Sequence, residues 1–420
     1  MDVTWPTRKL RDLADIRVSN VDKKVQPNEK AINLCNYMDV YSNEYVSNRI
    51  QFMEGSASTA EIDRFGLNCG DVIITKDSET PDDIGISTVI VEEIPNLVCG
   101  YHLALIRPNI NEIDPIYLAK QLSTSAVARY FAIHASGSTR YGLPIAAIES
   151  TEIATPPKNE QIKIAEILST VDRGIEQTEA VIAKQQRIKT GLMQNLLTLG
   201  IDEHGNLRSE ETHKFKDSQL GRIPVEWKIN KLLDIVALAE GQKDPRKEPY
   251  CNWPLVAPDH VESKTGLLLN LMTAREQRAI SGKYEFAPGD IVYSKIRPYL
   301  RKAVLVDFTG LCSADMYPMR PKGEIVSEFI LLTILGEQFS KYAESVSERS
   351  GFPKINRSEL AGFLVVTPPN SEQKRISDLS NEFAKSLQLE TKKLNKLRSL
   401  KKALMQDLLT GEKRVTHLTK

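Results

Sequence analysis

Two stretches of this chain carry the same pattern of apolar and polar positions. Residues 155–198 read TPPKNEQIKIAEILSTVDRGIEQTEAVIAKQQRIKTGLMQNLLT, and residues 367–410 read TPPNSEQKRISDLSNEFAKSLQLETKKLNKLRSLKKALMQDLLT. The two align without a gap at a constant offset of 212 residues. An internal duplication explains this match better than shared composition does.

In both copies the apolar residues recur at spacings of three, four and seven after a Pro-Pro pair, which predicts a long amphipathic helix. A narrow apolar stripe over about 40 residues is typical of a coiled coil. We expect the two helices to bury their stripes on each other; the alternative is that each packs only on its neighbouring domain. The predicted helix-pairing residues are Ile164, Val171, Ile175, Ile182, Ile188 and Leu192 in the first copy, and Ile376, Phe383, Leu387, Leu394, Leu400 and Leu404 in the second.

The segments outside these helices also match each other. RKLRDLADI (8–16) resembles NKLLDIVAL (230–238), CGDVIITK (69–76) resembles PGDIVYSK (288–295), and VCGYHLALIRP (98–108) resembles LCSADMYPMRP (311–321). Such β-branched runs between turn residues predict short strands, and residues 116–135 and 328–346 each predict one helix after them. The predicted fold class is therefore α+β, with two mixed α/β domains separated by two long helices in an internal repeat.

This organisation predicts six segments. They are a first domain over 1–154, a long helix over 155–199, a polar linker over 200–216, a second domain over 217–366, a second long helix over 367–411 and a C-terminal tail over 412–420.

Composition limits what the chain can do alone. Among 420 residues, 55 Lys and Arg balance 55 Asp and Glu, so no bulk charge draws the molecule to nucleic acid or to an anionic membrane. No stretch resembles a signal peptide or a membrane span, which predicts a cytoplasmic protein without a membrane partner. The five cysteines are widely spaced, which indicates reduced thiols rather than disulfides or a zinc site.

Motifs of catalysis are missing from the sequence. It contains no phosphate-binding Gly-rich loop, no zinc-protease motif and no nucleophile elbow. The segment PDHVESK (258–264) places Asp259, Glu262 and Lys264 close together, as a nuclease might require, but the matching segment after Asp39 lacks the second acid and the lysine. We therefore expect a non-catalytic chain that binds no metal and no cofactor.

Two pairs of loops favour nucleic-acid binding, because basic residues beside an aromatic one suit contacts to phosphates and base edges. The first pair follows the matched GD strands; its loop in the second half is basic, whereas TKDSETPDDIG (75–85) in the first half keeps Lys76 but is otherwise acidic. The second pair precedes the long helices. Ordinary solvated charge and simple helix-leading turns are the alternatives. The candidate DNA-binding residues are Lys76, Ser138, Thr139, Arg140 and Tyr141 in the first half, and Lys295, Arg297, Tyr299, Arg301, Lys302, Arg349, Lys354 and Arg357 in the second.

The combination of LGRIPVEWKI (220–229), GD-[IV]-x-x-[ST]-K in both halves, and TPP-x2-EQ leading to LMQ-[ND]-LLT at both helices resembles the DNA-specificity subunit of Type I restriction-modification systems. The resemblance implies that each domain is a target-recognition domain for one half of a split site in double-stranded DNA. It also implies that the helices form an antiparallel coiled coil, which sets the distance between the half-sites.

The same resemblance implies two methyltransferase subunits as partners, with motor-nuclease subunits as further partners. S-adenosylmethionine is expected on the methyltransferase and not on this chain. The first half departs from the family pattern because it has only TWPTRKL (4–10) in place of the LG-x-IP-x2-W start, which leaves the placement of its first strand open. Two other hypotheses remain: a coiled-coil scaffold without DNA readout, and an enzyme in its own right.

Overall fold

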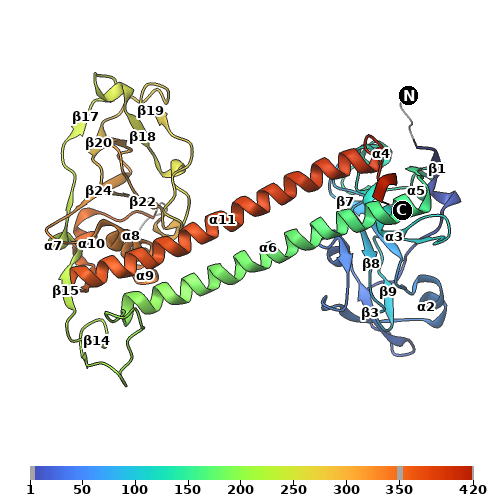
Figure 1. Cartoon of the computed structure of the whole chain (residues 1–420), viewed down its shortest axis with the longest axis horizontal. Coiled ribbons are helices and arrows are strands. Elements are labelled where there is room, and N and C mark those ends of the chain that lie inside the picture. Colours follow the sequence, from blue (N-terminus) through green and yellow to red (C-terminus); the bar gives the residue numbers. More distant parts are fainter. Residues whose placement is uncertain (1–4, 348–352, 419–420) are drawn as a thin grey trace. The chain divides into compact units, whose positions relative to one another are not determined.

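The computed structural model describes residues 5–347 and 353–418. The chain divides into two units: unit 1 comprises Met1–Glu179 and Lys392–Lys420, and unit 2 comprises Ala180–Thr391. The boundary falls inside both long helices, α6 (Lys158–Thr198) and α11 (Asn370–Leu409), so each unit contains part of each helix (Figure 1).

Unit 1 is built on two main sheets, one with strand order β2-β10-β6-β8-β4 and one with order β5-β3-β9. Strands β1 and β12 form a separate pair, as do β7 and β11. The bounds are β1 Thr7–Lys9, β2 Ala14–Val18, β3 Lys30–Cys35, β4 Tyr45–Val46, β5 Met53–Ala57, β6 Val72–Thr75, β7 Asp77–Ser78, β8 Ser87–Ile90, β9 Leu97–Cys99, β10 Leu103–Pro108, β11 Tyr141–Gly142 and β12 Glu152–Ala154.

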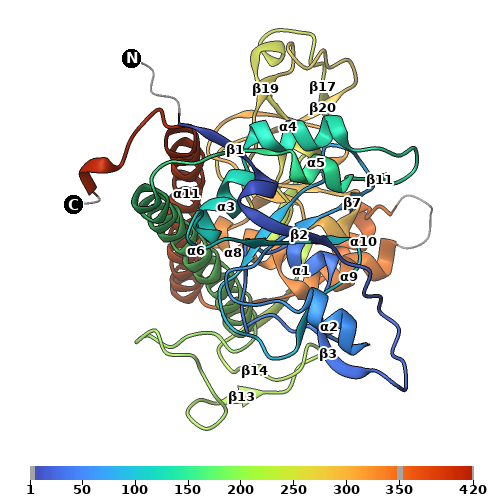
Figure 2. The same cartoon turned by 90° about the vertical axis from the view of Figure 1, so that its right-hand side faces the viewer.

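Five short helices complete unit 1, and Figure 2 shows this unit facing the viewer. They are α1 Tyr37–Tyr41, α2 Thr59–Phe65, α3 Pro115–Leu122, α4 Ser125–His134 and α5 Ile145–Glu149. The sequence VIIT of β6 is buried at all four positions, as is LALI of β10. Such continuous apolar runs belong to strands that are covered on both faces. The main core of unit 1 joins these strands to α3, α4, the start of α6 and the end of α11.

Unit 2 contains sheets with strand orders β16-β24-β21-β22 and β17-β20-β23-β18-β19, and the pairs β15-β25 and β13-β14. Its strands are β13 Phe215–Lys216, β14 Ile223–Pro224, β15 Lys228–Lys231, β16 Val236–Leu238, β17 Gln242–Lys243, β18 Pro254–Val256, β19 Met272–Thr273, β20 Lys283–Phe286, β21 Ile291–Ser294, β22 Ala303–Leu305, β23 Gly310–Cys312, β24 Met316–Pro321 and β25 Leu364–Thr367. Its short helices are α7 Leu232–Ile235, α8 Ser327–Leu335, α9 Glu337–Ser347 and α10 Arg357–Gly362.

The two units repeat one topology. The order β2-β10-β6-β8 of unit 1 corresponds strand for strand to β16-β24-β21-β22 of unit 2. The parallel pair β3-β9 corresponds to β18-β23, and the antiparallel pair β1-β12 to β15-β25. The duplication seen in the sequence therefore extends to the mixed α/β domains, and the predicted fold class is confirmed.

The single helix predicted after the strands of each domain is interrupted, so that each unit has two helices there. In unit 1 the break lies between α3 and α4, where the hydroxyls of Ser123 and Thr124 donate to the carbonyls of Ala119 and Gln121. Side chains that bond to nearby backbone in this way favour helix ends. In unit 2 the break lies at Gly336, the C-cap of α8, because glycine has no side chain to stabilise a helix interior. The apolar pattern alone did not reveal either break.

The two long helices contact each other in antiparallel directions within each unit. In unit 1 Arg398 donates to Glu179 at 2.7 Å, and a Cβ added to Gly174 would meet Leu397 at 3.7 Å. In unit 2 Gln185 donates to Ser386 at 3.3 Å.

The contact face of each helix follows alternating steps of four and three residues, the heptad spacing of a coiled coil. All of these positions are buried or half-buried. They are Ile164, Leu168, Val171, Ile175, Thr178, Ile182, Gln185, Lys189, Leu192 and Leu196 in α6, and Ile376, Ser380, Phe383, Leu387, Glu390, Leu394, Leu397, Lys401, Leu404 and Leu408 in α11.

Two predicted helix-pairing residues lie outside this face. Ile188 and Leu400 expose 46% and 47% of their surface, and the adjacent residues Lys189 and Lys401 occupy the heptad positions instead. A lysine can lay its aliphatic stem along an apolar face while its ammonium reaches a polar group. The prediction followed apolar residue types and was therefore wrong by one position at this point in both helices.

The aspartate of each GD motif fixes the strands of its sheet. Asp71 accepts two hydrogen bonds from Arg107, at 2.8 and 2.6 Å, and Asp290 accepts two from Arg320, both at 2.8 Å. Each carboxylate also accepts from the backbone N–H three residues earlier. Since both aspartates are buried, these bidentate pairs explain the GD and RP motifs as structural parts of the duplicated frame.

The glutamate of each EQ motif lies at the start of one long helix and binds the segment that follows the other long helix. In unit 2 the buried Glu372 accepts from Arg208 at 2.5 Å, from the indole of Trp227 at 3.0 Å and from the N–H of Ile201 at 2.9 Å. The chain passes this carboxylate closely: a Cβ at Gly200, where φ is +74°, would lie 2.2 Å from it.

In unit 1 the equivalent Glu160 accepts two hydrogen bonds from Arg414, one of them at 2.9 Å. Arg414 lies over the ring of Trp5, and Val415 is buried in the core of unit 1. Trp5 thus takes the place of Trp227, and it stands at the equivalent position before the matched RKLRDL and NKLLDI segments. This similarity of TWPTRKL to EWKINKL was missed in the sequence.

The glutamine of each EQ motif fixes its long helix to the N-cap residue of a short helix in the same unit, α3 in unit 1 and α8 in unit 2. Gln161 donates to the carbonyl of Pro156 at 2.9 Å and accepts from the N–H of Asp114 at 2.8 Å. Gln373 does the same with Pro368 at 2.9 Å and with Val326 at 3.0 Å. The motifs that carry the duplication are therefore architectural, and chemistry that differs between the halves must lie elsewhere.

Candidate nucleic-acid interface

Three separate segments meet at one lysine in each unit. In unit 1 the N–H of Lys76 donates to the carbonyl of His102 at 2.8 Å, and the carbonyl of Lys76 accepts from Leu143 at 2.8 Å. We call Lys76, Asp77, His102 and residues 141–143 junction 1. The candidate loop after the GD strand and the candidate loop before the long helix, far apart in sequence, are thus neighbours.

Unit 2 repeats this arrangement. The N–H of Lys295 donates to Asp315 at 2.9 Å, and the carbonyl of Lys295 accepts from Ile355 at 2.9 Å. We call Lys295, Ile296, Asp315 and residues 353–355 junction 2. Since the backbone bonds correspond one for one, the two junctions differ in side chains and not in frame.

Junction 1 contains a triad of hydrogen-bonded polar side chains, Lys76, Asp77 and His102. The carboxylate of Asp77 accepts from Lys76 at 2.9 Å through one oxygen and contacts the Nδ1 of His102 at 2.5 Å through the other. Burial acts to raise the pKa of Asp77, but Lys76 and His102 outweigh it, and the pKa is lowered below its usual value. The carboxylate is therefore ionised and both of its oxygens are occupied.

A tight hairpin loop lies directly beside this triad. Strand β11 pairs with β7, so that Gly142 lies opposite Asp77 and Tyr141 opposite Ser78. The loop closes at Ser136 and Gly142, and a Cβ at Gly137, where φ is +149°, would lie 2.0 Å from the carbonyl of Arg140. Three predicted DNA-binding side chains are exposed on it: Ser138, Thr139 and Arg140.

Junction 2 is cationic instead. The ammonium of Lys295 lies 5.2 Å and the guanidinium of Arg357 5.8 Å from the centre of the Tyr317 ring, and Lys354 pairs with Ile296 next to them. Burial lowers the pKa of Lys295, and the neighbouring Lys354 lowers it further. A cation whose pKa is lowered by a neighbouring cation favours an anion, and a DNA phosphate fits that requirement.

The loop after β21 holds the other predicted residues of unit 2. Arg297 and Arg301 both have φ near +48° and flank a 3-10 turn, η4 (Pro298–Leu300). Left-handed conformations are costly for residues other than glycine, and they are most often found where function requires them. Tyr299 exposes 48% of its surface between the two arginines, whereas Lys302 is engaged with the carbonyl of Pro258 at 2.6 Å.

The structure thus brings together Lys76 with the hairpin of Tyr141 in unit 1, and Lys295 with Lys354 and Arg357 in unit 2. Arg349 lies outside the described residues. Sequence reasoning missed Asp77, His102, Asp315 and Tyr317. A signal was present, because His102 and Asp315 fall at the same place in the aligned segments VCGYHLALIRP and LCSADMYPMRP.

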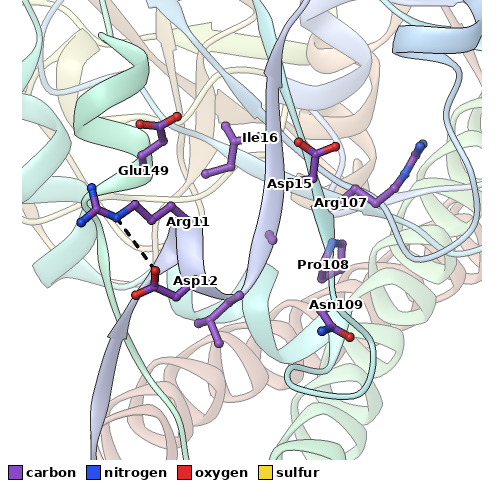
Figure 3. A pocket seen from close by; sticks show the side chains of 10 residues that line it. Arg11, Asp12, Asp15, Ile16, Arg107, Pro108, Asn109 and Glu149 are labelled. Atoms are coloured by element: carbon purple, nitrogen blue, oxygen red, sulfur yellow. Dashed lines mark ion pairs between the residues drawn. The ribbon is translucent and has the colours of Figure 1, made fainter.

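A polar pocket of unit 1 lies apart from junction 1, along β2 and the end of β10 (Figure 3). Its two arginines are already paired, Arg11 with Asp12 at 3.9 Å and Arg107 with Asp71, and Asp15 is paired with Arg17. Glu149 also lines the pocket and makes no ion pair with a described residue. Because neither arginine lacks a carboxylate partner, the pocket provides a control site for experiments on the junctions.

Within residues 5–347 and 353–418 the structure contains neither a metal-binding group of side chains nor a membrane-spanning helix. No group of three or more His, Cys, Asp or Glu side chains there could hold a metal ion. No helix in the described part of the chain is long and apolar enough to span a membrane. The five cysteines are free thiols, of which Cys69 is exposed.

Comparison with known proteins gives one family. The model of the Type I restriction modification DNA specificity domain matches the chain twice, over residues 2–185 and 224–399. The chain is 34% identical over 245 residues to the Type I restriction enzyme EcoDI specificity subunit of Escherichia coli, and the match covers 54% of each protein. The chain thus spans about half the length of this relative.

Two further relatives match nearly the whole chain. It is 22% identical over 428 residues to the protein assigned as the type I restriction enzyme MjaX specificity subunit of Methanocaldococcus jannaschii, covering 98% of this chain and 94% of that one. The crystal structure of the Type-I restriction-modification system S subunit from M. genitalium has a TM-score of 0.61 at 15% identity, over 97% of this chain and 96% of that one. At this identity the second comparison shows a shared fold.

Proposed function

We propose that this chain, which belongs to the Type I restriction modification DNA specificity family, reads a split site in double-stranded DNA, with unit 1 reading one half and unit 2 the other. The observation that carries the proposal is the pair of junctions: the same backbone bonds present a Lys-Asp-His triad in unit 1 and a cationic cluster in unit 2. A retained frame with different side chains suits two readers of two different sequences.

The candidate residues supply both kinds of contact that sequence reading needs. Arg140 and Arg297 are exposed on loops beside the junctions, and arginine can bind guanine O6 and N7 with two hydrogen bonds. Lys354 and the serine and threonine of the hairpin can bind phosphate oxygens. The balanced total charge supports a division of labour in which partner subunits supply much of the phosphate contact.

The proposed partners are two methyltransferase subunits, with motor-nuclease subunits as further partners. A partner that binds twice needs two equivalent surfaces, and the duplication provides them. Ile188 and Leu400 occupy equivalent positions, and both are exposed outside the contact face of the helices. S-adenosylmethionine would bind to the methyltransferase. This chain would act without catalysis, in the cytoplasm where the DNA is.

The test is to co-express the chain with an adenine methyltransferase of its family and to map methylated adenines across a genome. The proposal expects a two-part motif with a constant gap. Replacing residues 1–154 with the first domain of another family member should change one half of the motif and leave the other. Methylation without any motif, or a swap that alters both halves, would contradict it; the first result is what a scaffold without DNA readout predicts.

Single substitutions should act on one half-site each. Arg140→Ala should relax the half read by unit 1, and Arg297→Ala the half read by unit 2, each by roughly 1–3 kcal/mol of discrimination at one position. Arg11→Ala, in the charge-paired pocket of Figure 3, is the matched control and should leave both halves unchanged.

A further inference from the structure

One position in each junction combines an identical backbone role with a different side chain. His102 and Asp315 each accept the N–H of the junction lysine through their carbonyl, so their Cα atoms have equivalent places in the two units. His102 has φ +72°, which is rare for a residue with a large side chain. A strained conformation at a site whose side chain differs between two readers points to a functional requirement.

The ring of His102 is oriented by its neighbours. Its Nδ1 contacts the ionised Asp77 at 2.5 Å, and the Tyr101 ring lies with its centre 3.8 Å away. A carboxylate can only accept, so Nδ1 must carry the hydrogen. The Nε2 atom is then the acceptor of the neutral ring. Within the described residues Nε2 has no hydrogen-bond partner, and it is not among the buried unpaired atoms.

Asp315 offers the same chemistry from the equivalent place. The backbone N–H of Asp315 donates to the hydroxyl oxygen of Ser313 at 3.2 Å, and this bond orients the residue. Its carboxylate makes no hydrogen bond or ion pair with any described residue and is not among the buried unpaired atoms. Both junctions therefore present a hydrogen-bond acceptor with a fixed backbone, beside a lysine at the same position.

We propose that His102 and Asp315 are specificity-determining residues of the two readers, each accepting a hydrogen bond from the exocyclic amino group of an adenine or cytosine in the major groove. This inference rests on the proposed function and deepens it. In the major groove adenine N6 and cytosine N4 are the donors. Asp77 is a positioning residue, because it selects the tautomer that leaves Nε2 free to accept.

The first experiment uses the complete complex of this chain with its methyltransferase and a library of randomised DNA sites at pH 8. His102→Ala should reduce the preference for A or C at one position of the first half about tenfold or more. Asp315→Ala should do the same in the second half. Each variant controls the other, since an unchanged opposite half shows that the protein is folded and assembled.

The outcomes separate this inference from the proposed function. If the wild-type complex reads no split site, the proposed function fails. If the wild type reads one and neither variant changes the base preference of its own half, the inference is overturned. A variant that lowers total methylation while both halves keep their preferences also overturns it, because that residue would only support the fold.

The second experiment tests the acceptor itself with the same library. His102→Gln, which keeps a side-chain hydrogen-bond acceptor, should retain the A or C preference of the first half. Asp77→Asn should weaken that preference, because the ring loses the carboxylate that fixes its tautomer. A His102→Gln variant that loses the preference as completely as His102→Ala would exclude readout by an acceptor at this position.

Discussion

The two units share their strand order and their junctions, but they hold the long helices in different ways. In unit 1 a cluster of charged groups joins the domain to both helices: Lys120 donates to Asp172 at 2.6 Å, and Lys401 contacts the same carboxylate at 2.8 Å. Glu44 contacts both lysines, and Tyr45 donates to Asp172 at 2.6 Å.

In unit 2 the equivalent positions at the offset of 212 residues carry no such cluster. Leu332 stands in place of Lys120, Ala384 in place of Asp172, and Lys189 in place of Lys401. Lys189 retains the heptad position without a hydrogen-bond or ion-pair partner in the described part of the chain, and burial lowers its pKa. The fold therefore does not require a buried ion cluster at this place. The free energy of removing the charges from water is about as large as the free energy gained from their mutual attraction.

The largest expected effect concerns the glutamates that join the helix ends. Glu372→Ala leaves Arg208 and the indole N–H of Trp227 unpaired in a buried site, and should destabilise the protein by about 4 kcal/mol. Glu160→Ala leaves Arg414, which is more exposed, and should cost roughly half as much. Thermal unfolding of the two variants in parallel measures the difference. Equal losses would show that the indole contact contributes nothing.

The charged cluster of unit 1 should behave as a unit. Asp172→Ala leaves Lys120 buried with only Glu44, and should cost about 3 kcal/mol. The double variant Lys120→Leu, Asp172→Ala gives unit 1 the residues that unit 2 has, and should recover at least half of that loss. Denaturant unfolding of wild type, both single variants and the double variant tests this. A double variant as unstable as the sum of the singles would mean that unit 1 depends on its ions.

Acid should weaken unit 1 through the same cluster. Burial acts to raise the pKa of Asp172, but Lys120, Lys401 and Tyr45 outweigh it, so the pKa is lowered. A lowered carboxyl pKa contributes stability that is present above the usual value near 4 and is lost as pH falls through the lowered one. Unfolding midpoints between pH 6 and 2 should therefore fall more steeply for the wild type than for the double variant. Parallel curves would contradict this linkage.

The smallest effect should distinguish the two heptad lysines. Lys189→Met removes a desolvated charge without a partner among the described residues, and should stabilise the protein by about 0.5–1 kcal/mol. Lys401→Met removes a partner of Asp172 and Glu44 and should destabilise it instead. Because the lowered pKa of Lys189 favours deprotonation in the folded state, the gain should shrink as pH rises toward the usual pKa of a lysine. Two substitutions of the same sign would remove the distinction between the units.

The fold could be predicted to the extent that local pattern determines it. The heptad stripes, the TPP and EQ motifs and the matched strands predicted two long helices and two mixed domains, because helix and strand periodicity depend on residues close in sequence. The pattern failed at Ile188 and Leu400, where a lysine occupies the contact face, and at the α3–α4 and α8–α9 breaks, where single side chains or a glycine end a helix.

The candidate site was predicted in part for the same reason. Arg140, Lys295 and Lys354 stand in loops with visible basic and aromatic residues. His102 and Asp77 are 25 residues apart, and the pairing of β6 with β10, continued by the bond from Lys76 to His102, brings them together. No local signal shows that a histidine ring will be oriented by an aspartate on another strand.

The sequence by itself determined the duplication, the family and the two long helices, because these depend on repeated motifs with fixed spacing. Tertiary structure alone decided which loops meet at each junction and which charges are paired. Those properties arise when strands distant in sequence exchange backbone hydrogen bonds, and one such frame accepts His102 in unit 1 and Asp315 in unit 2.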